Sequence, residues 1–432
     1  MKRPSLFLAA MVAAVVLAAG LAACGGSDDN GGGGGGGKAS FDLTIGDSVP
    51  LSGDLADYGP PGDKAAKVAV AQINKAIKSN GSEQTVKLVT EDNETSPQGA
   101  TQAARKLVAD GASCIAGAWA SSDTIPTARS VTIPEGVMLI SPASTADEIS
   151  TLDDNGLVAR TSPPDRFQGP TLTEAISKDL GGAKGKTVNI GARNDAYGNG
   201  LVKTFGDAWK KAGGTVGQTV VYDPTQPSYN SEAQQLVSGS PDATVIFDFP
   251  ETFVKVGPAL ERTGKWDPTT AWGTDGLASS DLPGDVGEST VEGMRGTAPG
   301  VPDTAAPSKA FDKLYTSSAP KDVDRQTFDA QNFDAVMLCY LAAVAAGSSN
   351  GEDIGGQIDA VSGPPGKQYA WDQLPQAVKA LENGDDIDYV GASGSLDLND
   401  QGDPESGVYD IYQFKGGEIN IIGEEPVGGA GG

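Results

Sequence analysis

Three hydroxyl side chains and one aspartate have the chemistry to hold a small zwitterion. Ser121 and Ser122 precede a predicted helix, and Thr145 ends the run at residues 141–145. Asp275 comes much later in the chain. Hydroxyl groups and free backbone N–H groups at a helix N-terminus suit a carboxylate, and an aspartate pairs with an ammonium group. These residue types therefore indicate a site for a small zwitterion.

Aromatic side chains offer flat apolar walls for the same site, namely Tyr58, Trp119, Tyr197 and Trp272. Each feature also has a purely structural explanation, because serine caps helices, an Asp-Gly pair makes a turn and aromatic residues fill cores. A binding site is favoured because all of these residues follow predicted strands. Open parallel sheets bind ligands at the carboxyl ends of their strands.

Strands alternate with amphipathic helices in two successive series, which predicts parallel sheets covered by helices on both faces. We expect an α/β chain of two lobes, with a first crossing between them at residues 158–170. The pattern alone does not place the predicted helix at 329–346 or the strand-rich tail after Gly391. The first series has strands at 43–49, 86–89, 113–116 and 137–140 and helices at 61–77, 97–108 and 123–131; the second has strands at 187–190, 216–221, 243–247 and 270–272 and helices at 200–211, 231–237 and 252–262.

The composition excludes several classes of function. A chain of 432 residues, 38% of them hydrophobic, can build two domains with real cores. Its formal net charge of −26 argues against nucleic acid, which needs a basic face. The chain has no histidine and no G-x-S-x-G motif, which argues against Ser-His-Asp and Cys-His catalysis. We therefore expect a binding protein with neither enzymatic activity nor a cofactor, and an extracellular hydrolase is the disfavoured alternative.

The first residues have the pattern of a secretory signal. Lys2 and Arg3 precede an uncharged apolar run at residues 6–23, which ends at Cys24. The small residues before this cysteine look like the lipobox of a bacterial lipoprotein, in which Cys24 would carry a lipid. An uncleaved membrane helix is the alternative. Residues 24–40, with seven consecutive glycines, then serve as a flexible linker without a fold of its own.

Two further features have both a structural and a functional interpretation. Cys114 lies in a strand-like run and Cys339 in a helix-like run. We expect two buried thiols, because free cysteine is usually buried, although a disulfide is open to an extracytoplasmic protein. The loop at residues 397–403 crowds oxygen ligands around a glycine, as calcium loops do, but it lacks the downstream glutamate. We expect a turn there and no metal site.

A series of short motifs follows a fixed order along the chain. They lie at residues 45–53, 58–59, 92, 115–122, 140–145, 160–165, 197–200 and 333–336. Their order and spacing resemble those of the type I periplasmic binding proteins, in particular the leucine/isoleucine/valine-binding receptors of ABC importers. The resemblance covers about residues 41–414, and no single motif within it is specific.

The resemblance assigns roles to individual residues. Ser121, Ala143 and Thr145, with Ser144 adjacent, would hold the ligand's α-carboxylate. Asp275 would hold its ammonium group, where a glutamate is usual in the family. Trp119 takes a side-chain-pocket position that is often filled by a smaller residue, so the ligand's side chain stays open. The remaining candidates are Tyr58, Ala120 and Tyr197 in the matching loops and Glu251, which with Phe249 lies nearest to an aromatic position of the family.

The resemblance also implies the topology and the function. Three crossings would join lobe 1, residues 41–160 and 297–388, to lobe 2, residues 161–296 and 389–432. We expect a monomeric lipoprotein that is anchored to the extracytoplasmic face of the cell membrane, delivers an amino acid to an ABC permease and closes its lobes on the ligand. The alternatives are an amide, urea or aromatic acid as the ligand, or a sensor that signals to a membrane partner.

Overall fold

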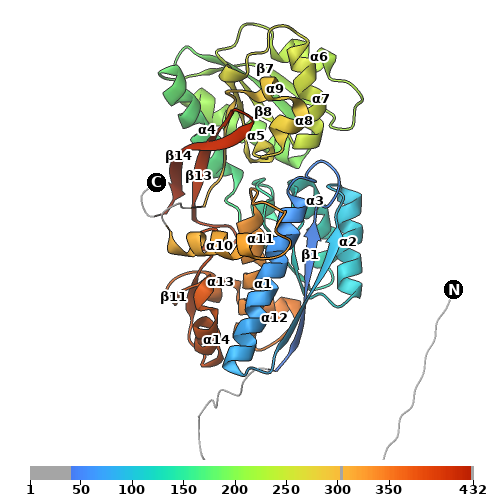
Figure 1. Ribbon diagram of the computed structural model, residues 1–432, viewed down its shortest axis with the longest axis vertical. Coiled ribbons are helices and arrows are strands. Elements are labelled where there is room, and N and C mark those ends of the chain that lie inside the picture. The colour runs from blue at the N-terminus through green and yellow to red at the C-terminus, as the bar shows by residue number, and fades with distance from the viewer. Residues whose placement is uncertain (1–39, 302–304, 430–432) are drawn as a thin grey trace, which may run out of the picture. The chain divides into compact units, whose positions relative to one another are not determined.

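The computed structural model describes residues 40–301 and 305–429 (Figure 1). The expected signal segment, Cys24 and nearly all of the glycine-rich linker lie outside the described residues, so their roles remain predictions. Among the described residues, no helix combines the length and the apolar character that crossing a membrane requires.

The first sheet has five strands in the order β2-β1-β3-β4-β5, and every neighbouring pair is parallel. This confirms the parallel sheet that the first series of elements predicted. The strands are β1 (Asp42–Val49), β2 (Thr85–Asp92), β3 (Cys114–Ala116), β4 (Met138–Ser141) and β5 (Val158–Arg160).

Helices cover both faces of this sheet because successive side chains of a strand point to opposite faces. Cys114 and Ala116 of β3 pack with α1 and α11, whereas Ile115 packs with α2 and α3. Figure 1 shows α1 and α2 on opposite sides of β1. The helices are α1 (Gly59–Asn80), α2 (Pro97–Ala109), α3 (Ser121–Thr127), the π-helix η1 (Ala128–Thr132), the short η2 (Ile149–Thr151) and α11 (Asp329–Ala346).

The two cysteines form a disulfide, which corrects the expectation of two free thiols. Cys114 and Cys339 face each other in the core between β3 and α11, with their Cα atoms 5.8 Å apart. The alternation along β3 turns Cys114 toward the helix that carries Cys339. This contact joins residues 225 positions apart, so no local pattern could reveal it.

Replacing both cysteines by alanine is expected to lower the free energy of unfolding by about 2–4 kcal/mol, because the bond closes a long loop in the unfolded chain. The urea midpoint of the double variant compared with that of the native chain checks this. Replacing both partners avoids leaving a reactive thiol. Equal midpoints would mean that the disulfide contributes nothing to stability.

The second sheet has seven strands in the order β14-β13-β10-β9-β8-β6-β7. Its strands β6 to β10 are parallel, and β13 pairs antiparallel with both β10 and β14. The strand-rich tail therefore completes this sheet. The strands are β6 (Thr187–Arg193), β7 (Thr215–Tyr222), β8 (Ala243–Phe247), β9 (Ala271–Gly273), β10 (Arg295–Pro299), β13 (Ser406–Lys415) and β14 (Glu418–Gly428).

Two groups of helices cover this second sheet. Helices α4 and α5 share a core with Val245 and Phe247 of β8, and α6 to α8 share one with Ile246 of the same strand. Asp195 starts α5 by accepting a hydrogen bond from the backbone of Gly198. The helices are α4 (Asp165–Leu180), α5 (Ala196–Lys211), α6 (Asn230–Leu236), α7 (Pro250–Glu261), the 3-10 turns η3 (Pro268–Thr270) and η4 (Asp275–Leu277), α8 (Leu282–Val286) and α9 (Glu288–Val291).

The chain passes between the two sheets three times, but two boundaries differ from those expected. Strand β10 belongs wholly to the second sheet, so a boundary at residue 297 would cut through it. Tyr389, Leu396 and Leu398 pack in the core of the first sheet, so the chain returns after these residues and not at residue 389. The remaining elements of the first lobe are α10 (Ala306–Ser317), α12 (Gly351–Gly355), α13 (Ile358–Ser362), β11 (Lys367–Ala370), η5 (Trp371–Gln373), α14 (Leu374–Glu382) and β12 (Ile387–Val390).

The loop at residues 397–403 is held by contacts within the protein. The side-chain oxygen of Asn399 accepts hydrogen bonds from the backbone N–H groups of Gln401 and Asp403. The carboxylate of Asp403 forms an ion pair with Arg160 at the end of β5. The acidic residue that suggested a calcium loop thus anchors the third crossing to the first.

Candidate ligand-binding site

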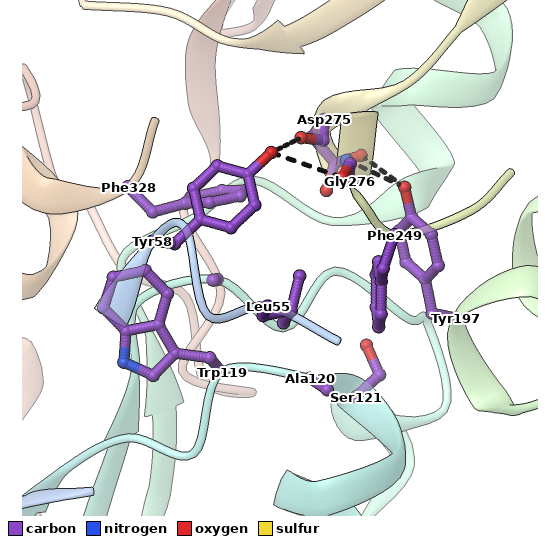
Figure 2. A pocket seen from close by; sticks show the side chains of 11 residues that line it. Leu55, Tyr58, Trp119, Ala120, Ser121, Tyr197, Phe249, Asp275, Gly276 and Phe328 are labelled. Atoms are coloured by element: carbon purple, nitrogen blue, oxygen red, sulfur yellow. Dashed lines mark hydrogen bonds between the residues drawn. The ribbon is translucent and has the colours of Figure 1, made fainter. Parts of the chain in front are cut away.

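A narrow pocket lies where strands of both sheets end, and it has about 10 Å³ of space for the centre of a water molecule. Figure 2 shows Trp119 and Tyr58 on one side of this pocket and Phe249 and Tyr197 on the other. The sequence predicted these lining residues: Tyr58, Trp119, Ala120, Ser121, Ala143, Tyr197 and Asp275. It did not predict these: Leu55, Phe249 as a lining residue in its own right, Gly276 and Phe328.

The three other candidates lie beside the pocket. Ser144 is buried, and its hydroxyl bonds to Thr124 and to the carbonyl oxygen of Trp119, at 2.7 and 2.8 Å. It therefore fixes the loop that carries Trp119. Glu251 is exposed in the first turn of α7, two residues beyond the lining Phe249.

Thr145 is fully buried next to a second buried acid that the sequence did not single out. The backbone N–H of Asp165 donates to the carbonyl oxygen of Thr145 at 2.8 Å. Burial raises the pKa of Asp165 well above its ordinary value, the charge of Asp275 raises this pKa further, and the Thr145 hydroxyl opposes the rise. Thr145 thus lies between the pocket and an acidic side chain of the first crossing.

Ser121 enters the pocket because β3 ends five residues before it and α3 begins at it. The residue is almost completely buried, and its hydroxyl oxygen accepts a hydrogen bond from the backbone N–H of Ala146 at 3.2 Å. Its proton is therefore available for an anionic group. Figure 2 shows this hydroxyl directed into the pocket, on the side of Phe249.

Trp119 forms one end of the pocket and rests on α1. A Cβ atom at Gly62 would lie 2.3 Å from the indole ring, so only glycine leaves room for the ring there. Phe328 meets both Trp119 and Tyr58 edge to face, with each pair of ring centres 6.4 Å apart. This aromatic wall limits how long a side chain the pocket accepts.

Asp275 brings a negative charge from the second lobe, on the 3-10 turn η4 that follows β9. Its carboxylate accepts a hydrogen bond from the Tyr197 hydroxyl at 3.0 Å. Burial raises the pKa of Asp275 to about 6, while hydrogen bonds from Gln168 and Tyr197 oppose the rise. Above this pH the pocket contains a buried carboxylate that forms no ion pair with any of residues 40–301 and 305–429, and such a group suits an ammonium.

The hydroxyl of Tyr58, a residue that the sequence placed among the ligand contacts, is bonded to the backbone of the second lobe. The hydroxyl donates to the carbonyl oxygens of Asp275 and Gly276, at 3.3 and 3.2 Å. Tyr58 belongs to the first lobe and η4 to the second. Tyr58 therefore joins the lobes and orients the turn that carries Asp275, while its ring lines the pocket.

The missed lining residues had weak or no signals in the sequence. Phe249 was noted only as one of the two residues nearest to an aromatic position of the family. Leu55 lies between the two motifs at residues 45–53 and 58–59. Phe328 reaches the pocket because it adopts a left-handed backbone, with φ of 73°, directly before α11. No local pattern indicates that contact.

A family model for periplasmic binding proteins matches residues 42–400 of this sequence. The chain belongs to the type I periplasmic binding proteins. Members of this family are extracytoplasmic solute-binding proteins that work with ABC transporters, and this binding protein falls with the leucine/isoleucine/valine-binding group.

One curated relative and two solved structures illustrate the family. A leucine-, isoleucine-, valine-, threonine- and alanine-binding protein of Pseudomonas aeruginosa is 26% identical over 369 residues, which are 84% of this chain and 88% of the relative. A branched-chain amino acid transporter substrate-binding protein of Streptococcus pneumoniae, solved with isoleucine, has a TM-score of 0.72 at 19% identity and covers 90% of this chain and 100% of its own. A solute-binding protein of Rhodopseudomonas palustris, solved with benzoate, has a TM-score of 0.69 at 19% identity, and the match covers 90% of this chain and 98% of its own. The two structures support the fold of this binding protein.

Proposed function

We propose that this protein is a lipid-anchored receptor that binds an α-amino acid in the pocket and delivers it to an ABC permease. One observation carries the proposal: Ser121, with its hydroxyl, and the buried acid Asp275 line one pocket from different lobes. An α-amino acid carries a group for each of them. The aromatic rings between them suit an apolar side chain.

The ligand's two charged groups would meet complementary partners. The carboxylate would accept hydrogen bonds from the Ser121 hydroxyl and from the run at residues 143–145. The ammonium would pair with Asp275. A ligand with both groups draws the lobes together, because each lobe holds one of its charges.

The ligand's side chain would be small or branched and apolar, because Trp119, Phe328 and Leu55 already fill much of the pocket. Leucine, isoleucine, valine and alanine, four of the amino acids named for the Pseudomonas relative, fit this description. Benzoate, the ligand of one structural neighbour, offers the alternative of an aromatic acid that stacks on these rings. Benzoate has no ammonium group and leaves Asp275 without a partner.

Replacing Trp119 by alanine should change the selectivity of the pocket. We expect the affinity for leucine and phenylalanine to rise relative to that for alanine by about tenfold, because removing the indole ring makes room for longer side chains. Each methylene that a pocket accommodates changes the binding free energy by about 1–3 kcal/mol. Calorimetric dissociation constants for these three amino acids check this. Trp266→Ala is the control, because Trp266 donates to the carbonyl oxygen of Thr290 away from the pocket. An unchanged order of affinities would show that Trp119 does not limit the side chain.

A thermal-shift screen of the purified chain tests the proposed function. The panel contains the small and branched amino acids, phenylalanine, amides, urea, benzoate and hydroxybenzoates. A ligand at 100 times its dissociation constant stabilises the folded protein by about 2.7 kcal/mol, which raises the melting temperature measurably. A shift with amino acids supports the proposal. If only aromatic acids or amides raise the melting temperature, the proposed ligand class is wrong and one of these takes its place. If no compound raises it, the proposal is contradicted.

A further inference from the structure

One loop of the first lobe, residues 50–58 between β1 and α1, contacts the second lobe with three side chains. Tyr58 donates to the carbonyl oxygens of η4, as described above. Asp57 accepts a hydrogen bond from the Ser279 hydroxyl at 2.5 Å. Asp54 pairs with Arg193 at the end of β6. The loop therefore bridges the lobes at the pocket, since Leu55 and Tyr58 also line it.

The contact of Asp54 is an ion pair with a nearly buried partner. The Nη2 atom of Arg193 lies 2.9 Å from the carboxylate oxygen Oδ2 of Asp54, and the hydroxyl of Thr252 donates to the same oxygen at 3.2 Å. The Arg193 side chain is 4% exposed and that of Asp54 is 29% exposed. A pair with this little contact with water is screened less than a surface pair.

The other strong partners of Arg193 belong to its own lobe. Its Nε atom pairs with Asp195, and its Nη1 atom lies 3.8 Å from Asp248. The guanidinium also stacks on the ring of Phe249, 3.7 Å from its centre. Opening the lobes leaves these contacts in place, and the contacts with Asp54 are lost. Asp123, also in the first lobe, adds a weaker attraction for the charge of Arg193.

We propose that Asp54 and Arg193 form a latch that favours the closed arrangement of the lobes, so that Asp54 sets the affinity for every ligand of the pocket. This inference rests on the proposed binding role of the pocket. Asp54 is a positioning residue: it is absent from the pocket lining, and it acts through Arg193, which holds the lining ring of Phe249.

The latch acts on a population. The apparent dissociation constant equals the intrinsic one divided by the fraction of protein in the binding-competent closed state. A latch that exists only in the closed state raises this fraction equally for all ligands. Weakening the latch should therefore lower the affinity for all ligands by one common factor, whereas the loss of a direct contact would lower the affinities for different ligands unequally.

The test compares Asp54→Asn with the native chain by calorimetry and stopped-flow kinetics for the amino acids that bind in the thermal-shift screen. We expect all dissociation constants to rise by the same factor, about tenfold, mostly through faster dissociation. Asp54→Glu should recover part of the affinity because it restores the charge. Asp207→Asn is the matched control, since Asp207 pairs with Lys203 of the same helix, α5, on the exposed surface and does not bridge the lobes. An affinity unchanged within twofold, or factors that differ between ligands, would overturn the latch.

A measurement without ligand separates this inference from the proposed function. Small-angle X-ray scattering of the ligand-free chains should give a larger radius of gyration for Asp54→Asn than for the native chain, because fewer molecules are closed. Identical curves would overturn the latch even where amino acids bind. If no ligand of the screen binds but the curves differ, the latch stands and the proposed amino-acid ligand fails.

Discussion

Replacing Asp275 by asparagine is expected to weaken the binding of an α-amino acid by about 2–4 kcal/mol, roughly 30- to 1000-fold. Asparagine keeps the shape of the side chain and can still accept the hydrogen bond of Tyr197. It removes the negative charge from a fully buried position beside the pocket, so the ligand's ammonium loses its ionic partner. Calorimetric titration of the native and variant chains at pH 7.5 measures the difference.

The dependence of binding on pH gives this prediction a second, independent outcome. Burial raises the pKa of Asp275 to about 6 in the ligand-free protein, and only the charged carboxylate attracts an ammonium group. Affinity for an amino acid is therefore fully present above pH 6 and declines as the pH falls through this value. Asp275→Asn should abolish this step in the pH profile.

The control for Asp275 is Glu251→Gln, which removes a charge from the exposed first turn of α7. We expect it to change affinity less than threefold, because an exposed charge outside the pocket interacts weakly with the ligand. Native affinity in Asp275→Asn would place the ammonium elsewhere. An aromatic acid would then be the better candidate ligand, since it needs no partner at Asp275.

Local patterns in the sequence predicted those parts of the fold and site that depend on local periodicity. The helix α11 begins and ends where the apolar run at residues 329–346 does. Trp119, Ser121 and Ala143 lie in the pocket because each follows a strand of a parallel sheet. Asp275 reaches the same pocket from the other sheet for the same reason. The rule about strand ends thus predicted that these residues lie together, and they line one pocket.

Contacts between distant segments could not be predicted in this way. The partner of Cys114 is 225 residues away, and its choice depends on which face of β3 meets α11. The Tyr58 hydroxyl looked like a ligand contact, but its partners are backbone atoms of η4, which have no sequence signature. Asp403 lies in a loop that shares features with calcium loops, and its actual partner, Arg160, comes from a strand 243 positions earlier. In each case the residue type indicated that the side chain has a specific partner, but the sequence did not indicate which residue that partner is.

Asp403 is also the residue whose charge we expect to matter most for stability. Its carboxylate lies 2.7 Å from the Nε atom of Arg160 and 2.9 Å from Nη1 of Arg166, and it accepts a hydrogen bond from Ser150 at 2.7 Å. Arg160 has no exposed side-chain surface. Asp403→Asn should lower the free energy of unfolding by about 3–5 kcal/mol, because it leaves a buried guanidinium without its counter-charge.

The expected loss depends on pH in a defined direction. Burial alone would raise the pKa of Asp403, but the charge and hydrogen bond of Arg160 outweigh burial and hold this pKa below its ordinary value. The contribution of the carboxylate is therefore present above about pH 4, the ordinary pKa of aspartate, and is lost as the pH falls through the lowered value. Urea midpoints of the native and Asp403→Asn chains should differ fully at pH 7 and converge in acid.

The matched control is Glu148→Gln, which breaks an ion pair with Arg129 that is about half exposed on both sides. That variant should lose at most about 1 kcal/mol, as exposed pairs do. Arg160 also donates to the carbonyl oxygens of Ser144 and Ala146, which flank Thr145, so the buried pair holds the wall of the pocket as well. If Asp403→Asn were as stable as Glu148→Gln, the hydrogen bonds from Arg160 to these carbonyl oxygens would be sufficient to stabilise its charge, and the crossing would not depend on Asp403.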